Sequence, residues 1–207
     1  MNKNVFYNRK FAVTFVIIVA VLSVLLGGAR GLNALRDNAV DVFEGRTPGA
    51  RFHSLVDNIG GLFTSGKADA YYSLGKKIND RVSSAETIIA IAENRLPGDN
   101  DIKDLKNAVS ILKRTSDINE KIKYNDIMTA SFSKIKDKVN IGANDGDYSR
   151  WTIACNDMIS HKGTMDGNCA DYNKLAEDFN KRLSGFPANI IRLLGLTEKL
   201  PVYGISN

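Results

Sequence analysis

Histidine, cysteine, proline and tryptophan are all scarce in this chain of 207 residues, which contains two His, two Cys, four Pro and one Trp. With only two cysteines, the chain is not a small fold held together by a dense disulfide network. An apolar share of 43% excludes a disordered or collagen-like chain. The composition is therefore that of an ordinary folded protein.

Acidic residues are absent from the first 36 positions, and Asp37 is the first of them. Those positions hold five basic residues, whereas the other 171 residues carry 23 basic and 23 acidic side chains. The net charge of +5 therefore comes entirely from the N-terminal end. A domain that binds DNA or RNA normally carries a basic face. We expect no nucleic-acid partner.

An uncharged, largely apolar run of nineteen residues occupies positions 11–29. As a helix it would measure about 28 Å, close to the thickness of a bilayer core. We expect a short basic tail over 1–10 and a single-pass transmembrane helix over 11–29, with the lipid bilayer as its partner. A weak excess of basic residues before the run favours a cytoplasmic N-terminus and an extracytoplasmic domain. The alternative is secretion after cleavage of a signal peptide near Ala29.

Apolar residues at helical spacing fill the rest of the chain, and no strict alternation typical of strands persists over five positions. The sequence predicts an all-α fold, in which the transmembrane helix is followed by an elongated antiparallel bundle of three to four long helices. The expected parts are a continuing helix and irregular connector over 30–67, the bundle over 68–194 and a C-terminal tail over 195–207.

Local signals predict where the helices end. Pro97-Gly98 stops one helix, and Asp99, Asn100 or Asp101 is suited to cap the next. Ser116-Asp117, with Glu120 three residues after Asp117, is expected to cap the helix after that. A turn is expected over 142–147. The segment 161–168 contains two glycines and predicts an interruption of the next helix.

Cys155 and Cys169 leave two alternatives open. In one unbroken helix, fourteen residues would separate them by about 21 Å, which is beyond the reach of a disulfide. A loop over 161–168 would let the chain fold back, and a disulfide could then form in a domain outside the cytoplasm. Otherwise the two residues are free thiols. The chain has no CxxC motif, so a redox-catalytic role is not expected.

Motifs that carry catalysis or hold a cofactor are missing from the sequence. His53 and His161 have no Glu or Cys at metal-ligand spacing. Neither a phosphate-binding glycine loop nor a GxSxG nucleophile elbow occurs. The acidic run at 144–147 lacks the distal Glu of a calcium loop. We therefore expect no catalytic, cofactor-binding or metal-binding residues, and no enzyme.

An aromatic-asparagine pattern repeats near the C-terminus, as Tyr172-Asn173, Phe179-Asn180 and then Phe186-Pro187-Ala188-Asn189. It resembles the closing signature of the LemA family, in which a YN repeat at seven-residue spacing precedes FPxN and a short apolar tail. The apolar run followed by Leu32-Asn33-Ala34-Leu35-Arg36 is similar to the N-terminal pattern of that family. Residues 46–67 depart from it and keep only Leu55-Val56-Asp57-Asn58. The resemblance implies a membrane anchor and an elongated antiparallel bundle of the bacterial cell envelope, with no established activity.

The repeat also has a physical interpretation. Tyr172, Phe179 and Phe186 fall on one helix face every seven residues, which predicts an aromatic core. Asn173 and Asn180 lie beside them and are expected to form hydrogen bonds with neighbouring helices. A surface that binds a partner is the alternative for this face.

These observations predict an anchored interaction or scaffold module that recruits another membrane or envelope protein. The alternative is a membrane-tethered sensor or carrier that binds a small ligand between helices. A cavity of several hundred Å³ with converging polar groups would favour the ligand-binding alternative. A filled core with an exposed apolar patch would favour the scaffold.

Overall fold

The computed structural model describes residues 9–46 and 73–204, and every regular element in these ranges is an α-helix. The helices are α1 (Arg9–Glu44), α3 (Leu74–Arg95), α4 (Asn100–Leu112), α5 (Ile118–Lys138), α6 (Tyr148–Asn168), α7 (Ala170–Leu183) and α8 (Ala188–Leu193). The predicted all-α helical bundle is confirmed for the described ranges, which contain no strand. Of the continuing helix and irregular connector predicted over 30–67, residues 30–44 belong to α1, and residues 47–67, with His53, lie outside the described residues.

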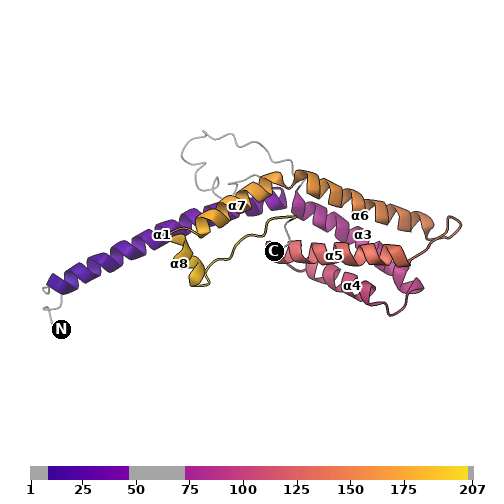
Figure 1. Cartoon of the computed structure of the whole chain (residues 1–207), viewed down its shortest axis with the longest axis horizontal. Coiled ribbons are helices and arrows are strands. Elements are labelled where there is room, and N and C mark those ends of the chain that lie inside the picture. The colour runs from indigo at the N-terminus through magenta and orange to yellow at the C-terminus, as the bar shows by residue number, and fades with distance from the viewer. Residues whose placement is uncertain (1–8, 47–72, 205–207) are drawn as a thin grey trace.

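Helices α3 to α6 form an antiparallel bundle at one end of an elongated molecule (Figure 1). In this bundle α3 packs against α4 and α6, and α4 packs against α5. Each helix contributes fully buried apolar side chains to one core, among them Ile78, Leu105, Met128 and Met158. Burial of such side chains stabilises the bundle by about 1.5–3 kcal/mol each.

The predicted helix boundaries at Pro97-Gly98 and at Asp117 are confirmed. Gly98 follows Pro97 with a φ of +83°, a conformation that favours glycine, and α3 has ended at Arg95. The Asp99 side chain accepts hydrogen bonds from the N–H groups of Asp101 and Ile102, at 2.8 and 3.3 Å. Asp117 caps α5 in the same way, accepting from the Glu120 N–H at 3.0 Å.

Helix α1 has 36 residues and measures about 54 Å. Its C-terminal half lies along α7, which runs antiparallel to it, and against α8 (Figure 1). Phe43 of α1 is buried and meets the ring of Tyr172 edge-on, with 5.3 Å between the ring centres. Glu44 forms an ion pair with Lys121 of α5 at 2.7 Å. The predicted bundle over 68–194 is therefore divided, because α7 and α8 pack on α1 and not among α3 to α6.

Residues 161–168 are helical, so the predicted interruption of this helix is wrong. Helix α6 runs through them, and a side chain added at Gly163 or Gly167 would meet nothing within 4 Å. Each exposed glycine costs a helix about 1 kcal/mol relative to alanine. Met158 and Met165 are buried on the opposite face of α6, and their packing offsets this cost. The helix breaks later, at Cys169, between α6 and α7.

The segment predicted to span a membrane, residues 11–29, lies in the N-terminal half of α1. The side chains of four of its residues lie outside the described part of the structure, namely Phe11, Leu22, Leu25 and Leu26. Judged on the residues that the structure describes, no helix combines the length and the apolar character needed to cross a membrane.

Candidate functional site

The C-terminal tail, residues 195–204, turns back after α8 and runs along α7 toward the bundle (Figure 1). Two of its side chains, Leu200 and Tyr203, are buried in the core. The residues before them are more open, and Leu196, Glu198 and Lys199 are exposed. The tail is therefore held mainly near its end.

Two asparagines of α7 bind the backbone of the tail. Asn180 donates from Nδ2 to the Leu200 carbonyl at 2.7 Å, and its Oδ1 accepts from the Leu200 N–H at 2.9 Å. Asn173 pairs with the carbonyl and N–H of Tyr203 in the same way, at 3.1 and 2.9 Å. The Tyr172 hydroxyl donates to the Pro201 carbonyl at 2.7 Å. We call this surface, made by Tyr172, Asn173 and Asn180, the α7 groove.

The spacing of the two asparagines matches the spacing of the residues that they bind. Seven residues of helix rise about 10.5 Å, and three residues of extended chain cover about 10 Å. Asn173 and Asn180 can therefore bind Tyr203 and Leu200 of one extended segment together. The sequence predicted hydrogen bonds from these amides to neighbouring helices, whereas the structure shows the C-terminal tail as their partner.

The aromatic members of the repeat divide into two kinds. Tyr172 and Phe179 are fully buried, so the predicted aromatic core is confirmed for both. The prediction is wrong for Phe186, which is 78% exposed. Helix α7 ends at Leu183, so the seven-residue spacing no longer keeps Phe186 on the same face. Pro187 is the N-cap of the short helix α8, and Asn189 is the second residue of that helix.

A buried arginine forms the polar centre of the bundle. Arg81 of α3 is 1% exposed, and it donates to Oδ1 of Asn125 and, at 2.8 Å, to Oγ1 of Thr129, both on α5. Burial lowers the pKa of Arg81, while Tyr203 and Asp126 act against this shift. An arginine stays protonated in proteins, so a cation is held here by neutral acceptors.

Tyr203 connects the α7 groove to this polar centre. Its hydroxyl donates to Oδ1 of Asp166 at 3.0 Å, and Asp166 forms an ion pair with Lys162 at 2.6 Å. Burial, with Asp166 nearby, raises the pKa of Tyr203 above its usual range, so the hydroxyl keeps its proton as a donor. The tail therefore contacts α7 through its backbone and α6 through its tyrosine.

Sequence reasoning missed Arg81, Asn125 and Tyr203. Arg81 could have been found from its position between Ile78 and Val82 on the apolar stripe of α3. A charged residue at such a position is either buried or extends its side chain to solvent. The tail carries no comparable signal, because its short polar and apolar mixture follows neither helical nor strand periodicity.

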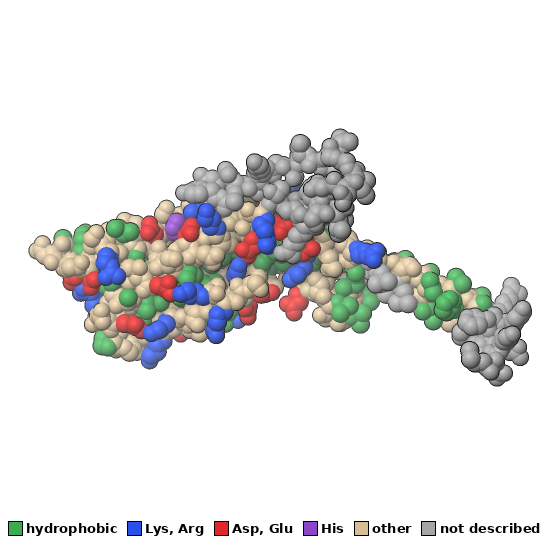
Figure 2. All heavy atoms as spheres, turned by 180° about the vertical axis from the view of Figure 1, so that it is seen from behind, with side chains coloured by type: hydrophobic (Ala, Val, Ile, Leu, Met, Phe, Trp, Pro, Cys, Tyr) green, Lys and Arg blue, Asp and Glu red, His purple; other side chains and the backbone are tan. Residues whose placement is uncertain are grey.

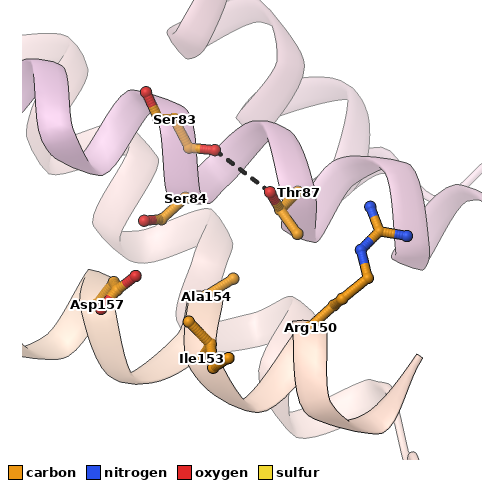
Figure 3. A pocket seen from close by; sticks show the side chains of 7 residues that line it. All are labelled: Ser83, Ser84, Thr87, Arg150, Ile153, Ala154 and Asp157. Atoms are coloured by element: carbon orange, nitrogen blue, oxygen red, sulfur yellow. Dashed lines mark hydrogen bonds between the residues drawn. The ribbon is translucent and has the colours of Figure 1, made fainter. Parts of the chain in front are cut away.

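Two hollows between helices of the bundle are open to solvent, and a third, of about 310 Å³, lies between α1, α8 and the start of the tail. Of the two bundle hollows, one, of about 370 Å³, lies beside Arg81 and includes Thr129, Lys136 and Lys162 in its lining. The other, of about 350 Å³, lies between α3 and α6 (Figure 3). There Ser83, Ser84 and Thr87 of α3 face Arg150, Ile153, Ala154 and Asp157 of α6, and Thr87 donates to the Ser83 carbonyl at 3.5 Å. Neither hollow brings acidic groups together with a histidine or cysteine.

Cys155 and Cys169 are both free. The continuous α6 keeps them about 21 Å apart, which is too far for a disulfide, so the structure favours the alternative of two free thiols. Burial raises the pKa of Cys155, which favours the unreactive thiol. His161 lies beside Lys77, with 3.5 Å between Nδ1 and Nζ. Over residues 9–46 and 73–204, no group of three or more His, Cys, Asp or Glu side chains is arranged to hold a metal.

Comparisons with protein-family models, curated proteins and solved structures found no match to this chain. The resemblance to the LemA family thus stays a prediction from the sequence pattern.

Proposed function

We propose that this chain is a membrane-anchored interaction module, not an enzyme, and that the N-terminal half of α1 lies in a lipid bilayer. In this proposal the N-terminus is cytoplasmic and the bundle recruits another envelope protein outside the cytoplasm. The observation that carries the anchor is the apolar arm, residues 12–24, whose described side chains are exposed on all sides of the helix. Its exposed fractions lie between 44% and 65% for Val13, Phe15, Val16, Ile17, Ile18, Val19, Val21 and Val24.

Such an arm is unfavourable in water. Full burial of a valine or isoleucine side chain is worth about 1.5–3 kcal/mol, so a bilayer around the arm would supply on the order of 10 kcal/mol. Figure 2 shows the contrast with the bundle, because hydrophobic side chains gather on the arm while basic and acidic side chains are interspersed over the bundle. The uncharged run over 11–29 in the sequence agrees with this placement.

A second apolar surface lies where the arm meets the rest of the molecule. Four side chains in and around α8 are 65–78% exposed, and we call them the α8 patch: Phe186, Leu193, Leu194 and Leu196. Helix α8 packs on α1, and Pro187 lies against Gly28, 3.3 Å from where a side chain would begin. The same bilayer surface that surrounds the arm would cover this patch.

The alternative of a small-ligand sensor or carrier has less support. It requires an enclosed cavity, whereas the two hollows between bundle helices and the hollow between α1 and α8 are all open to solvent. An exposed apolar surface beside a packed core is the arrangement expected of an anchor and docking module.

Flotation of the full chain with lipid vesicles tests the anchor. The double variant Ile17→Lys and Ile18→Lys should lose flotation, because a lysine near the centre of a bilayer costs roughly 2.5–3.5 kcal/mol. The matched control is Ile153→Lys with Ile159→Lys on α6, since these isoleucines are 59% and 50% exposed against 57% and 51% in the arm. The control should float like the unaltered chain. Flotation of the arm variant at the unaltered level would contradict the proposal.

A further inference from the structure

The α7 groove binds its occupant mainly through the backbone. Asn173 and Asn180 each satisfy both the N–H and the C=O of one tail residue, and Tyr172 binds a further carbonyl. Hydrogen bonds to the main chain hold an extended segment whatever its side chains are, and pockets for a few side chains then add selectivity. This is how peptide-binding sites recognise an extended ligand.

Two side-chain positions supply that selectivity. Leu200 and Tyr203 are buried, and the Tyr203 hydroxyl donates a hydrogen bond to Asp166. Pro201 lies between them in the chain, and its carbonyl accepts a hydrogen bond from the Tyr172 hydroxyl. The occupant that the groove accepts therefore has the form Leu-Pro-x-Tyr.

The tail is joined to the rest of the chain by an exposed stretch. Gly195 has a φ of +68° and turns the chain after α8, and Leu196, Glu198 and Lys199 are exposed. A segment on a short linker acts as a ligand at an effective concentration in the millimolar range. The tail is thus a tethered ligand that competes with other segments of the same form.

We propose that the α7 groove is a recognition site for an extended Leu-Pro-x-Tyr peptide, which the chain's own tail fills and which a partner's segment of that form enters when the tail leaves. This inference rests on the proposed function as an interaction module, because it names the chemistry of the partner. In this proposal the tail competes with the partner's segment for the α7 groove, so the affinity of the partner's segment must be high enough to displace the tail.

Peptide binding to a vacated groove tests the proposal. The receptor is the full chain in detergent with Leu200→Gly and Tyr203→Gly, and the probe is a fluorescent peptide with the sequence of residues 196–207. Fluorescence anisotropy should show saturable binding. Asn173→Ala and Asn180→Ala in the receptor should each weaken it by about tenfold, since each asparagine makes two hydrogen bonds to the occupant.

Two matched controls isolate the recognition. Asn107 is an exposed asparagine of α4, and Asn107→Ala in the receptor should leave the affinity unchanged. A peptide with serine at the positions of Leu200 and Tyr203 should not bind. Absence of probe binding to a receptor whose circular dichroism shows it folded would overturn the proposal, as would binding insensitive to both asparagines.

If the receptor variant does not fold, the proposal is tested by peptide displacement on the unaltered chain. Several millimolar of the unlabelled peptide should displace the tail and speed hydrogen exchange at the Leu200 and Tyr203 amides, while the serine-substituted peptide should not. Unchanged exchange would overturn the proposal. Both peptide measurements are made without a bilayer. A negative result in them would therefore overturn the peptide-recognition proposal only, and a negative flotation result would overturn the membrane anchor only.

Discussion

Arg81 shows how a single residue organises the interior of this bundle. A buried cation normally pairs with a carboxylate, but Arg81 donates to the side chains of Asn125 and Thr129. Asp126 lies close enough to oppose the fall in the pKa of Arg81, and burial raises the pKa of Asp126 itself. The arginine therefore fixes α3 against α5 through directional hydrogen bonds.

Removal of this side chain should destabilise the fold. Arg81→Ala should lower the free energy of unfolding by about 2–4 kcal/mol, because it leaves buried acceptors unsatisfied and creates a cavity. Arg81→Met should cost less, since its apolar chain fills part of the space. Urea unfolding followed by circular dichroism measures both. Arg150→Ala, at an exposed position of α6, is the control and should stay within about 0.5 kcal/mol of the unaltered chain. An Arg81→Ala effect as small as the control would show that Arg81 does not organise the core.

At the scale of elements, the continuity of α6 determines the arrangement of the C-terminal half. Because α6 reaches Asn168 and α7 begins at Ala170, the chain passes from the bundle to α1 with a single break at Cys169. This places α7 along α1 and leaves its asparagines facing the tail.

A glycine substitution tests this continuity. Gly163→Ala should raise the free energy of unfolding by about 0.5–1 kcal/mol, because alanine is the better helix former and the added methyl group meets no neighbour within 4 Å. Gly98→Ala is the contrasting variant and should destabilise, since Gly98 has a φ of +83°. Both are measured by urea unfolding. A neutral or destabilising Gly163→Ala would indicate that this segment is not helical in solution.

The sequence predicted the elements whose signals act within one turn. Asp117 caps the helix that it was expected to cap, and Asp99 is the one of three candidates that caps α4, because a cap involves only neighbouring residues. The segment 161–168 was misread because the packing of Met158 and Met165 outweighs the local effect of two glycines. The α7 groove was half predicted. The seven-residue spacing of Asn173 and Asn180 indicated that both lie on one helix face. The sequence did not indicate that the tail is their partner, because almost every residue has the same backbone N–H and C=O groups.

At the scale of the whole molecule, α1 is the element that connects the two proposed activities. Its C-terminal half is covered by α7 and α8, and Leu32, Ala39 and Phe43 are buried there. Its N-terminal half is the apolar arm, which extends away from the bundle (Figure 1). One continuous helix thus links the surface assigned to the bilayer with the groove assigned to peptide recognition. The basic residues of the first 36 positions flank the arm, and the rest of the chain is neutral.

The depth of the arm in a bilayer tests the central claim most directly. An environment-sensitive fluorophore is attached to Ile17→Cys in the full chain, with Cys155→Ala and Cys169→Ser removing the native thiols. In lipid vesicles its emission should shift to the blue, resist quenching by aqueous iodide and be quenched by nitroxide-labelled lipid. The same label at Ile153→Cys on the bundle should respond to iodide and not to the lipid quencher. Iodide quenching at position 17 equal to that at position 153 would contradict the account.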